Sequence, residues 1–287
     1  MKLKHSLRII FRNKTYSLLN IAGLTIGITA SALLLLWVEY FANNKRDVPD
    51  KKRIYEIGRH QRVGGRIETT FTVPAALFEN IIGGSIPEIR RSSRFLNERG
   101  TFAFEEGNKS IMQYGAYVDS ALFNMIDLPF ITGNRQTAFA TSRPIVISQR
   151  MSKTLFGDDY PLGKALKMNN AFYEVTGVFK DREPNGTFRF DWLIPYQVFS
   201  DDMASKGRVR YPWANWIQCY VETYPKTDIK GISERLTKIR NEKDTELISE
   251  MQYDLFLYSI SDRMLYGEFK DGKSIGGNIR TMGVALI

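Results

Sequence analysis

The sequence predicts an α+β protein in which one N-terminal transmembrane helix precedes an exported domain. The first observation behind this prediction is a run of 24 residues without a charge, from Thr15 to Val38. The second is the rest of the chain, where segments rich in aromatic and β-branched residues alternate with helical segments. A chain of 287 residues with 43% hydrophobic content is long and apolar enough for one or two domains with a sizeable core.

Positive charge is concentrated at the N-terminus. Five of the nine net positive charges belong to residues in the first 14 positions, with no acidic residue among them: Lys2, Lys4, Arg8, Arg12 and Lys14. The remainder of the chain is close to neutral. A chain that binds nucleic acid spreads its basic surplus along a face with interleaved aromatic residues, so this pattern argues against a nucleic-acid partner.

The uncharged run from Thr15 to Val38 has the length of a membrane span. At 1.5 Å per residue, 24 residues form a helix of roughly 36 Å, which crosses a bilayer with some tilt. A cleaved signal peptide has a shorter apolar region, about 7 to 15 residues, and ends in a small-x-small site. The signal peptide and a buried helix of a soluble protein remain as alternatives to a retained transmembrane helix over residues 15–41.

Flanking residues predict the orientation of this helix. Tyr16 at one end and Trp37, Tyr40 and Phe41 at the other are typical of the aromatic belts at the two membrane interfaces. Basic residues precede the span and Glu39 follows it, so the positive-inside rule places the N-terminus in the cytoplasm. Everything after Phe41 is then expected outside the cytoplasm.

Residues 1–14 have the pattern of a short amphipathic helix at the cytoplasmic membrane surface. Its apolar positions recur at helical spacing, and its basic residues occupy another face. The residues predicted to contact the membrane surface are Lys4, Arg8, Arg12 and Lys14. The alternative is a basic tail that only sets the topology of the span.

Three small residues, Gly23, Gly27 and Ser31, are four positions apart within the span. This spacing places them on one face of a helix, where small side chains let another helix approach closely. We therefore predict a helix-packing contact along this strip. Glycine and alanine are common in membrane helices, and the alternative is that the strip has no partner.

The region after the span contains both strand and helix signals and no repeat. The predicted strands are Arg53–Gln61, Arg66–Val73, Ile89–Phe95, Lys109–Val118, Ile145–Ser148, Phe172–Phe179, Trp216–Glu222 and Asp254–Ser259. The predicted helices are Pro74–Ile82, Gln149–Phe156, which ends at Gly157, and Asp228–Asn241. A division into two lobes is compatible with the turn clusters, with a weak boundary near Gly133 to Pro144.

Searches for catalytic residues give little. One Cys and two His cannot supply a zinc site or a Cys-His pair, and Cys219 within a predicted strand is best interpreted as a packed thiol. The acidic pairs Glu105-Glu106 and Asp158-Asp159 are expected in turns. Tyr211, Trp213 and Trp216 could line a ligand pocket but are more often core aromatics. The sequence therefore predicts no enzyme, no cofactor and no metal.

One nucleotide-binding pattern is matched literally. Residues 267–274, GEFKDGKS, satisfy the phosphate-loop pattern G-x-x-x-x-G-K-S. Only 13 residues follow, however, and Glu268 and Asp271 would repel phosphate. The predicted topology also places the segment outside the cell, so we predict that it binds no nucleotide.

Several segments together resemble a known family. These are RNKTYSLLNIAGLTIGITASALLLLWVE, KKRIYEIGR, SIPEIRRSSRF, SALFNMIDLPFITGN, PIVISQRMSKTLFGDDYPLGKALKMN, FYEVTGVFKD and PNGTFRFDWLIP. They resemble MacB/FtsX-type ABC transporter permeases, particularly those of Bacteroidetes-like bacteria, and LFGDDYPLGK and VTGVF are the most specific strings. One departure is the sequence after the span, EYFANN, where the family usually has a Glu-x-Ser-Tyr-Asp-type sequence.

The resemblance implies a transmembrane helix followed by an α+β periplasmic core domain with two subdomains. We accordingly expect a cytoplasmic helix over residues 1–14, the span over 15–41, the core domain over 42–261, and a linker with the start of a second span over 262–287. The family has further spans after the domain, so the chain resembles an N-terminal piece of a permease. The family has no catalytic residues of its own, and none is expected here.

The resemblance also implies partners and a location. A cytoplasmic ABC ATPase would drive the membrane helices, and the exported domain would rearrange to push or release a substrate. The expected partners are the lipid bilayer, that ATPase, the remaining permease helices or a second permease copy, and a periplasmic adaptor. The expected location is the cell inner membrane. The alternative function is a single-span, membrane-anchored periplasmic sensor or adaptor domain.

Overall fold

A computed structural model describes residues 14–42, 53–80, 84–98, 102–106, 109–168, 171–182, 188–207, 215–243 and 253–277. The chain divides into two units, one comprising residues 1–44 with 279–287 and the other residues 45–278. The first unit contains helix α2 (Lys14–Ala42), whose described side chains are almost all exposed. Within it, Thr15–Trp37 has a mean hydropathy of 2.0 and is long and apolar enough to cross a membrane.

The second unit is built on a 14-stranded mixed sheet. Along the sheet the strand order is β14-β1-β13-β4-β7-β12-β9-β11-β10-β5-β6, with β2, β3 and β8 paired to β1, β13 and β11. The bounds are β1 Ile54–Val63, β2 Arg66–Thr70, β3 Val73–Pro74, β4 Ile89–Asn97, β5 Phe102–Glu106, β6 Lys109–Gln113, β7 Gly115–Val118, β8 Phe130–Gly133, β9 Pro144–Ser148, β10 Ala165–Met168, β11 Ala171–Phe179, β12 Trp192–Pro195, β13 Asn215–Thr223 and β14 Tyr253–Ser259.

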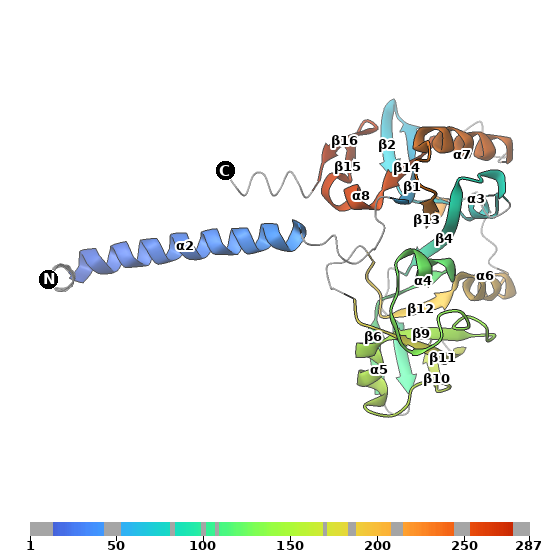
Figure 1. Ribbon diagram of the computed structural model, residues 1–287, viewed down its shortest axis with the longest axis horizontal. Coiled ribbons are helices and arrows are strands. Elements are labelled where there is room, and N and C mark those ends of the chain that lie inside the picture. Colours follow the sequence, from blue (N-terminus) through green and yellow to red (C-terminus); the bar gives the residue numbers. More distant parts are fainter. Residues whose placement is uncertain are drawn as a thin grey trace. The chain divides into compact units, whose positions relative to one another are not determined.

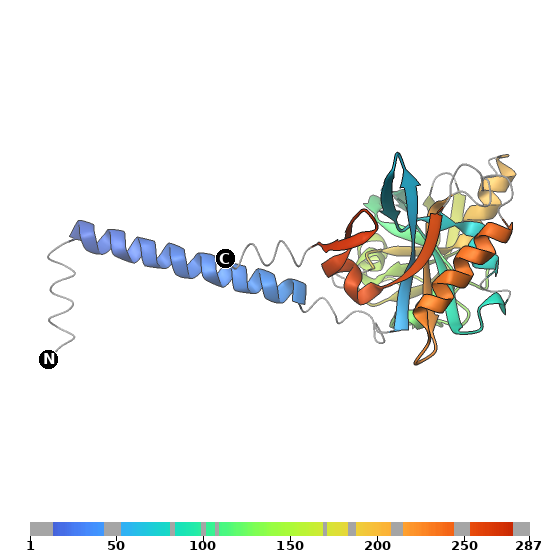
Figure 2. The ribbon, with the colours of Figure 1, turned by 90° about the horizontal axis from the view of Figure 1, so that it is seen from above.

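The helices of this unit are short, apart from α7, and a separate two-stranded hairpin follows the last of them. Their bounds are α3 Ala75–Asn80, α4 Ala121–Met125, α5 Gln149–Phe156, α6 Tyr196–Ser205, α7 Ile229–Lys243 and α8 Ile260–Tyr266. The hairpin consists of β15 (Glu268–Lys270) and β16 (Lys273–Gly276). Figure 2 shows α7 lying alongside β14. The mixture of helix and sheet confirms the predicted α+β class.

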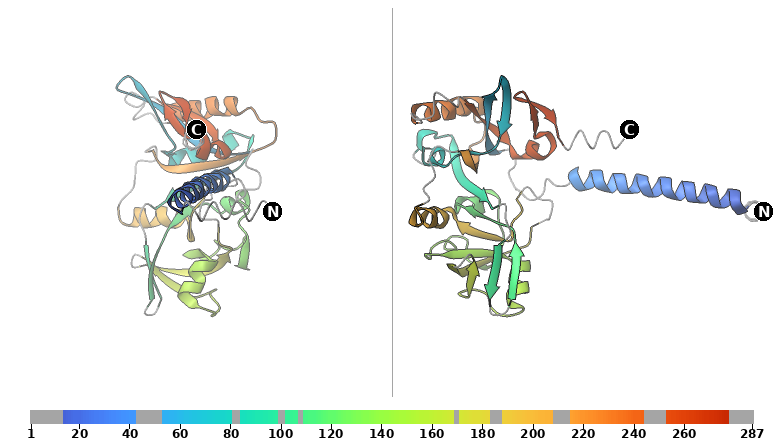
Figure 3. Two further views of the ribbon diagram at one scale, coloured as in Figure 1. Left: turned by 90° about the vertical axis from the view of Figure 1, so that its left-hand side faces the viewer. Right: turned by 180° about the vertical axis from the view of Figure 1, so that it is seen from behind.

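The elements of this unit form two lobes on the continuous sheet (Figure 1). The first lobe contains β1 to β4, β13, β14, α3, α7, α8 and the β15–β16 hairpin, and the second contains β5 to β12 with α4, α5 and α6. Figure 3 shows the same two lobes from behind. They are joined where β4 pairs with β7, with Phe95 opposite Val118. The fold predicted from the sequence, with two lobes, is therefore confirmed.

Both faces of the sheet are covered. Neighbouring residues of β9 show this, because Ile145 and Ile147 belong to one buried cluster and Val146 to the other. Side chains of α3, α5, α6 and α7 contribute to the first cluster, and side chains of α4 and α8 to the second. A strand buried on both faces has an uninterrupted apolar sequence, which explains the run in PIVIS.

The structure corrects three expectations. The segment from Gly133 to Pro144 links β8 to β9, and both strands flank β11, so this segment lies within the second lobe and the expected boundary there is wrong. Glu105 and Glu106 belong to β5 and not to a turn. Residues 262–276, expected as a linker, form the end of α8 and the β15–β16 hairpin, which contact β1, β2 and β14. The ordered domain thus continues past Ser261.

Candidate functional site

The small-residue strip of α2 lies on an exposed surface. Gly23, Gly27 and Ser31 are all exposed, and a Cβ atom added at either glycine would have no atom within 4 Å. Within the helix, Thr25 donates its hydroxyl to the Ile21 carbonyl at 2.7 Å, which leaves this side chain bonded to its own helix. The described part of the chain therefore leaves room for a second helix beside the strip, and the helix contact stays a prediction.

Most of the residues predicted to contact the membrane surface lie outside the described part of the chain. Lys4, Arg8 and Arg12 lie outside the described residues. Lys14 is the first residue of α2, so the helix begins at the last basic residue of the N-terminal cluster. Their contact with the membrane surface also stays a prediction.

The first and the last described elements of the second unit meet in the first lobe. β1, the first strand after α2, pairs with β14 along seven residues, from Tyr55 opposite Ser259 to Gln61 opposite Tyr253. α8 and the β15–β16 hairpin follow β14 directly. The strand that follows α2 and the last described elements of this unit are thus neighbours.

A buried acid fastens these two ends together. Glu56 of β1 is 2% exposed, and its carboxylate accepts hydrogen bonds from Gln218 Nε2 at 2.7 Å and from Arg263 Nε at 3.1 Å. The Arg263 guanidinium also lies 3.9 Å from the centre of the Phe71 ring. Burial raises the pKa of Glu56, against the opposing effects of Arg263 and Gln218. Arg263 therefore connects α8 to β1, the strand that follows α2.

Aromatic rings hold the C-terminal hairpin to the same place. The Phe269 ring of β15 lies 5.2 Å from Tyr258 and 5.9 Å from both Phe71 and Phe256, measured between centroids. His60 of β1 stacks on Phe256 at 4.2 Å, and burial lowers the pKa of its imidazole. Aromatic pairs at these distances add about 0.5–1.5 kcal/mol each beyond their buried area. The hairpin is consequently part of the lobe.

The phosphate-loop pattern in residues 267–274 forms this hairpin. Asp271 and Gly272 are its turn, with φ angles of 47° and 76°, as a two-residue turn of the type favoured by Asp-Gly requires. Lys273 begins β16, so a strand and not a helix directly follows Gly272. Residues 267–274 therefore do not form the strand, loop and helix order that cradles phosphate.

A second polar cluster lies where the lobes join. Arg94 of β4 binds Asp119 through two guanidinium hydrogen bonds of 3.0 and 2.7 Å, and its backbone N–H donates to the same carboxylate at 2.8 Å. The guanidinium lies 4.4 Å from the centre of the Phe78 ring and 4.0 Å from that of Tyr196. Phe78 belongs to the first lobe, and Asp119 and Tyr196 to the second, so Arg94 ties the two lobes together.

Neighbouring arginines of β4 bind a different acid. Arg90 and Arg91 both donate to Glu222 of β13, at 3.1 and 2.6 Å, and the Glu222 side chain is 6% exposed. Close by in sequence, Glu88 pairs with Arg235 of α7 at 2.6 Å. Two positive charges therefore share one buried carboxylate.

Chemistry-bearing residues are sparse in the described part of the chain. No group of three or more His, Cys, Asp or Glu side chains there could hold a metal ion. Cys219 is buried in β13, and burial raises the pKa of its thiol, which makes it a poor nucleophile. Trp216 packs against Tyr196 and Phe199 as a core aromatic, whereas Tyr211 and Trp213 lie outside the described residues.

Comparison with known proteins gives the family. The model of the MacB-like periplasmic core domain matches residues 17–239. This chain belongs to that family. Among solved structures, it is similar to a domain of a candidate permease from Porphyromonas gingivalis, with a TM-score of 0.62, 20% identity, and coverage of 84% of this chain and 100% of that one. The family assignment confirms the resemblance found in the sequence.

Two further relatives extend this comparison. The periplasmic region of MacB from Actinobacillus actinomycetemcomitans aligns with a TM-score of 0.53 and 14% identity, covering 75% of this chain and 92% of that one. A curated relative, an uncharacterized ABC transporter permease of Bacillus subtilis named YvrN, is 24% identical over 208 residues. The match covers 66% of this chain and 49% of YvrN, so this chain aligns with about half of that relative.

The sequence analysis predicted neither the Glu56–Arg263 contact nor the Arg94–Asp119 contact. Glu56 and Arg263 are 207 positions apart, and no periodicity links them. The one available signal was the charged residue within the apolar run Ile54-Tyr55-Glu56-Ile57, because a buried acid in a strand needs a partner.

Proposed function

We propose that this chain is the part of an ABC transporter permease that carries a transmembrane helix and the periplasmic domain. A cytoplasmic ATPase moves the membrane helices, and the domain rearranges to export or release a substrate. The family match and the permease relative support the assignment of the domain. The charge step across α2 supports an inner-membrane location with the N-terminus in the cytoplasm.

The observation that carries the coupling is the joining of the two domain ends in one lobe. β1 follows the span in sequence, and β14 and α8 end the described domain, so a displacement applied at either end acts on the same sheet. Arg263 and Glu56 lock these elements to one another at 3.1 Å. Arg94 then passes the movement across the junction to the second lobe. Packed elements of this kind transmit displacement because they do not deform continuously.

The proposal places another helix against α2. This partner belongs to the remaining permease or to a second copy, and it approaches along Gly23, Gly27 and Ser31. Gly23→Leu and Gly27→Leu insert side-chain volume between the helices and should weaken association in a membrane two-hybrid assay. Leu34→Ile, on the same helix, is the matched control and should associate like the parent. Equal association of all variants would show that α2 is only an anchor.

Copurification tests the coupling itself. The membrane protein, expressed together with a candidate ABC ATPase of the same organism, should retain that ATPase through detergent extraction and affinity purification. It should also alter the ATPase rate relative to the isolated enzyme. A chain that reaches the membrane and neither retains the ATPase nor changes its rate would favour the single-span adaptor instead.

A further inference from the structure

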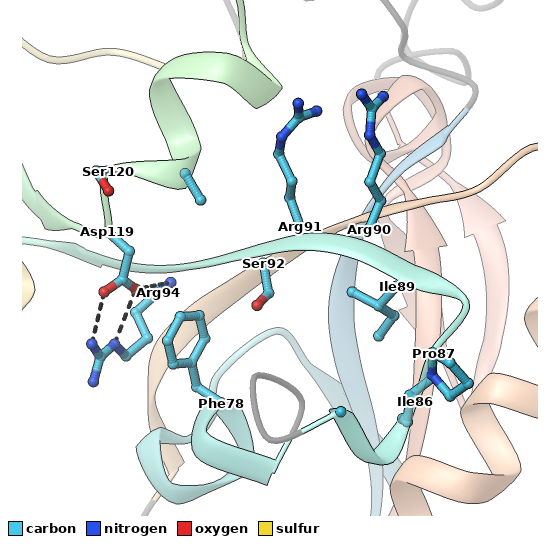
Figure 4. A pocket seen from close by; sticks show the side chains of 12 residues that line it. Phe78, Ile86, Pro87, Ile89, Arg90, Arg91, Ser92, Arg94, Asp119 and Ser120 are labelled. Atoms are coloured by element: carbon cyan, nitrogen blue, oxygen red, sulfur yellow. Dashed lines mark hydrogen bonds and ion pairs between the residues drawn. The ribbon is translucent and has the colours of Figure 1, made fainter. Parts of the chain in front are cut away.

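β2 forms an open edge of the sheet, whereas interior strands are paired along both edges. β4, which borders the pocket at the lobe junction in Figure 4, pairs with β13 on one edge and with β7 on the other. Within the described part of the chain, β2 pairs with β1 alone. Figure 2 shows the hairpin of β1 and β2 projecting from the first lobe.

The turn of this hairpin decides which main-chain groups point outward. It consists of two glycines at positions 64 and 65, with φ angles of 56° and 81°, so the flanking residues Val63 and Arg66 exchange hydrogen bonds. Hydrogen-bonded and non-hydrogen-bonded pairs alternate along an antiparallel ladder. Ile67 and Thr69 therefore direct their N–H and C=O groups away from β1. Among the described residues, none forms a hydrogen bond with these outward groups.

The free edge of β14, on the other side of β1, is closed by side chains of α7. Thr237 Oγ1 accepts the outward N–H of Leu255 at 2.9 Å, and Ser233 Oγ accepts that of Leu257 at 3.2 Å. Edge strands that lack such a cover are templates for pairing with another chain. The same lobe thus closes one edge and leaves the edge of β2 available.

A groove of about 620 Å³ lies beside the open edge, with the β15–β16 hairpin as its other wall. The Phe269 ring lies 6.0 Å from His60, which is opposite Thr69 in the ladder. A Cβ atom added at Gly272 would lie 3.1 Å from Ile67 Cγ2. Ile67 and Thr69 share one face of β2, so the hairpin packs on that face and leaves the main-chain edge open.

The lining of the groove is balanced in charge and partly apolar. Its charged side chains, two basic and two acidic, are Arg66, Lys270, Glu68 and Asp271. Its apolar side chains are Val63, which is 43% exposed, and the partly exposed Ile67 and Phe269. A lining without surplus charge does not select a small ion, and it suits an uncharged main chain with mixed side chains.

We propose that β2 binds an extended peptide segment of another polypeptide by antiparallel strand addition opposite residues 66–69. Main-chain donors and acceptors along an open edge are complementary to those of an added strand. Peptide residues opposite Ile67 and Thr69 turn toward the Phe269 side, which favours apolar side chains. Those opposite Arg66 and Glu68 favour an acid and a base, respectively. This binding is independent of the transport function, because it needs only the open edge and the groove.

Fluorescence anisotropy of a labelled peptide, measured on the full chain in phosphatidylcholine nanodiscs, tests the pairing. The probe is the capped peptide Thr-Val-Lys-Val-Glu-Thr, whose valines lie opposite Thr69 and Ile67, its lysine opposite Glu68 and its glutamate opposite Arg66. Saturable binding is expected, with empty nanodiscs as the blank. N-methylation of both valines removes the N–H groups that point at β2 and should weaken binding at least about tenfold.

The matched control is the isomer N-methylated at the lysine and the glutamate, whose N–H groups point away from β2. It should bind like the parent peptide. The absence of saturable binding of the parent peptide, or equal affinities of the two isomers, would overturn the proposal.

Two substitutions at one position of β2 separate the main chain from the side chain. Thr69→Pro removes the outward N–H and keeps the pairing with β1, because proline is tolerated where an edge N–H faces away from the sheet. Binding should weaken about tenfold. Thr69→Val keeps the N–H and loses only the hydroxyl, which lies 2.8 Å from His60 Nδ1, so its affinity should equal that of the parent protein.

Far-UV circular dichroism and mass photometry complete the test of these variants. Circular dichroism should show that both variants fold like the parent protein. Equal peptide affinity of Thr69→Pro and Thr69→Val would refute pairing at this edge. A parent dimer that Thr69→Pro converts to a monomer, together with no peptide binding, would assign the edge to a second copy of the chain and overturn the proposal.

Discussion

Removal of the Arg263 side chain tests the fastening of the two domain ends. Arg263→Ala leaves Glu56, whose side chain is 3% exposed, without its ion-pair partner, although Gln218 still donates at 2.7 Å. Loss of one partner from a fully buried pair costs about 3–5 kcal/mol. The Arg263 side chain is 35% exposed, so solvent screens part of this interaction and we expect about 2 kcal/mol. The lost contact with the Phe71 ring adds about 0.5–1 kcal/mol.

Urea unfolding of the full chain in detergent, followed by tryptophan fluorescence, measures this cost. Lys230→Ala removes an exposed ion pair on α7 and is the control, with an effect below about 0.5 kcal/mol. The double variant Glu56→Gln/Arg263→Ala has no charge left at this pair, so its loss should be smaller than the sum of the two single losses. Additive losses, or an Arg263→Ala effect no larger than the control, would refute the link.

The pH dependence of the same variant has a defined sign. The pKa of Glu56 is raised by burial, so the folded protein holds a proton that the unfolded chain has lost at pH values just above the usual glutamate range. The contribution of Glu56 to stability therefore falls as pH rises through this range. Arg263 opposes the rise in the pKa of Glu56, so without Arg263 the pKa is raised further and stability is lost over a wider pH range. The cost of Arg263→Ala should thus be larger at pH 8 than at pH 5. A cost independent of pH would contradict the assignment.

Two further predictions concern the lobe junction and the second lobe. Arg94→Leu leaves Asp119 without its two-point partner and removes the cation between two aromatic rings. The free energy of unfolding should therefore fall by about 2–3 kcal/mol in the same urea assay. An unchanged free energy of unfolding would show that Arg94 does not connect the two lobes. The hydrogen bond from Arg143 lowers the pKa of Asp202, so this pair stabilises the fold above the usual aspartate pKa and the benefit is lost as pH falls through the lowered value. Arg143→Gln should therefore reduce stability at pH 7 and have less effect at pH 3, and an equal effect at both would contradict the pair.

Local signals in the sequence were sufficient for some regular elements, such as α5, whereas α4, α6 and α8 were not predicted. α5 begins after Ser148, whose hydroxyl accepts the Met151 N–H at 3.1 Å, and ends at Gly157 with a φ of 65°. Both capping residues are visible in the sequence, and the predicted bounds of this helix match the structure. The family resemblance supplied the two-lobed architecture, which composition alone left open.

Contacts between distant segments were beyond such signals. Glu105-Glu106 belongs to a strand because β5 pairs with both β6 and β10, and no residue near this pair encodes those neighbours. The β15–β16 hairpin was assigned to a linker because its attachment depends on Phe269 meeting rings from β14 and from the segment after β2. The Glu56–Arg263 pair could not be predicted for the same reason, because the tertiary fold decides which distant polar groups are buried together.

The response of the periplasmic domain to ATP tests the central claim most directly. Cys219 is the one cysteine of the sequence and is 1% exposed, so nitroxide labels will attach to cysteines introduced by Arg62→Cys in the first lobe and Tyr160→Cys in the second. Double electron–electron resonance on the permease reconstituted with its ATPase should give distance distributions, within or between copies, that change between the nucleotide-free state and the state trapped with ATP and vanadate. Identical distributions in the two states, at a normal ATPase rate, would contradict the proposed coupling.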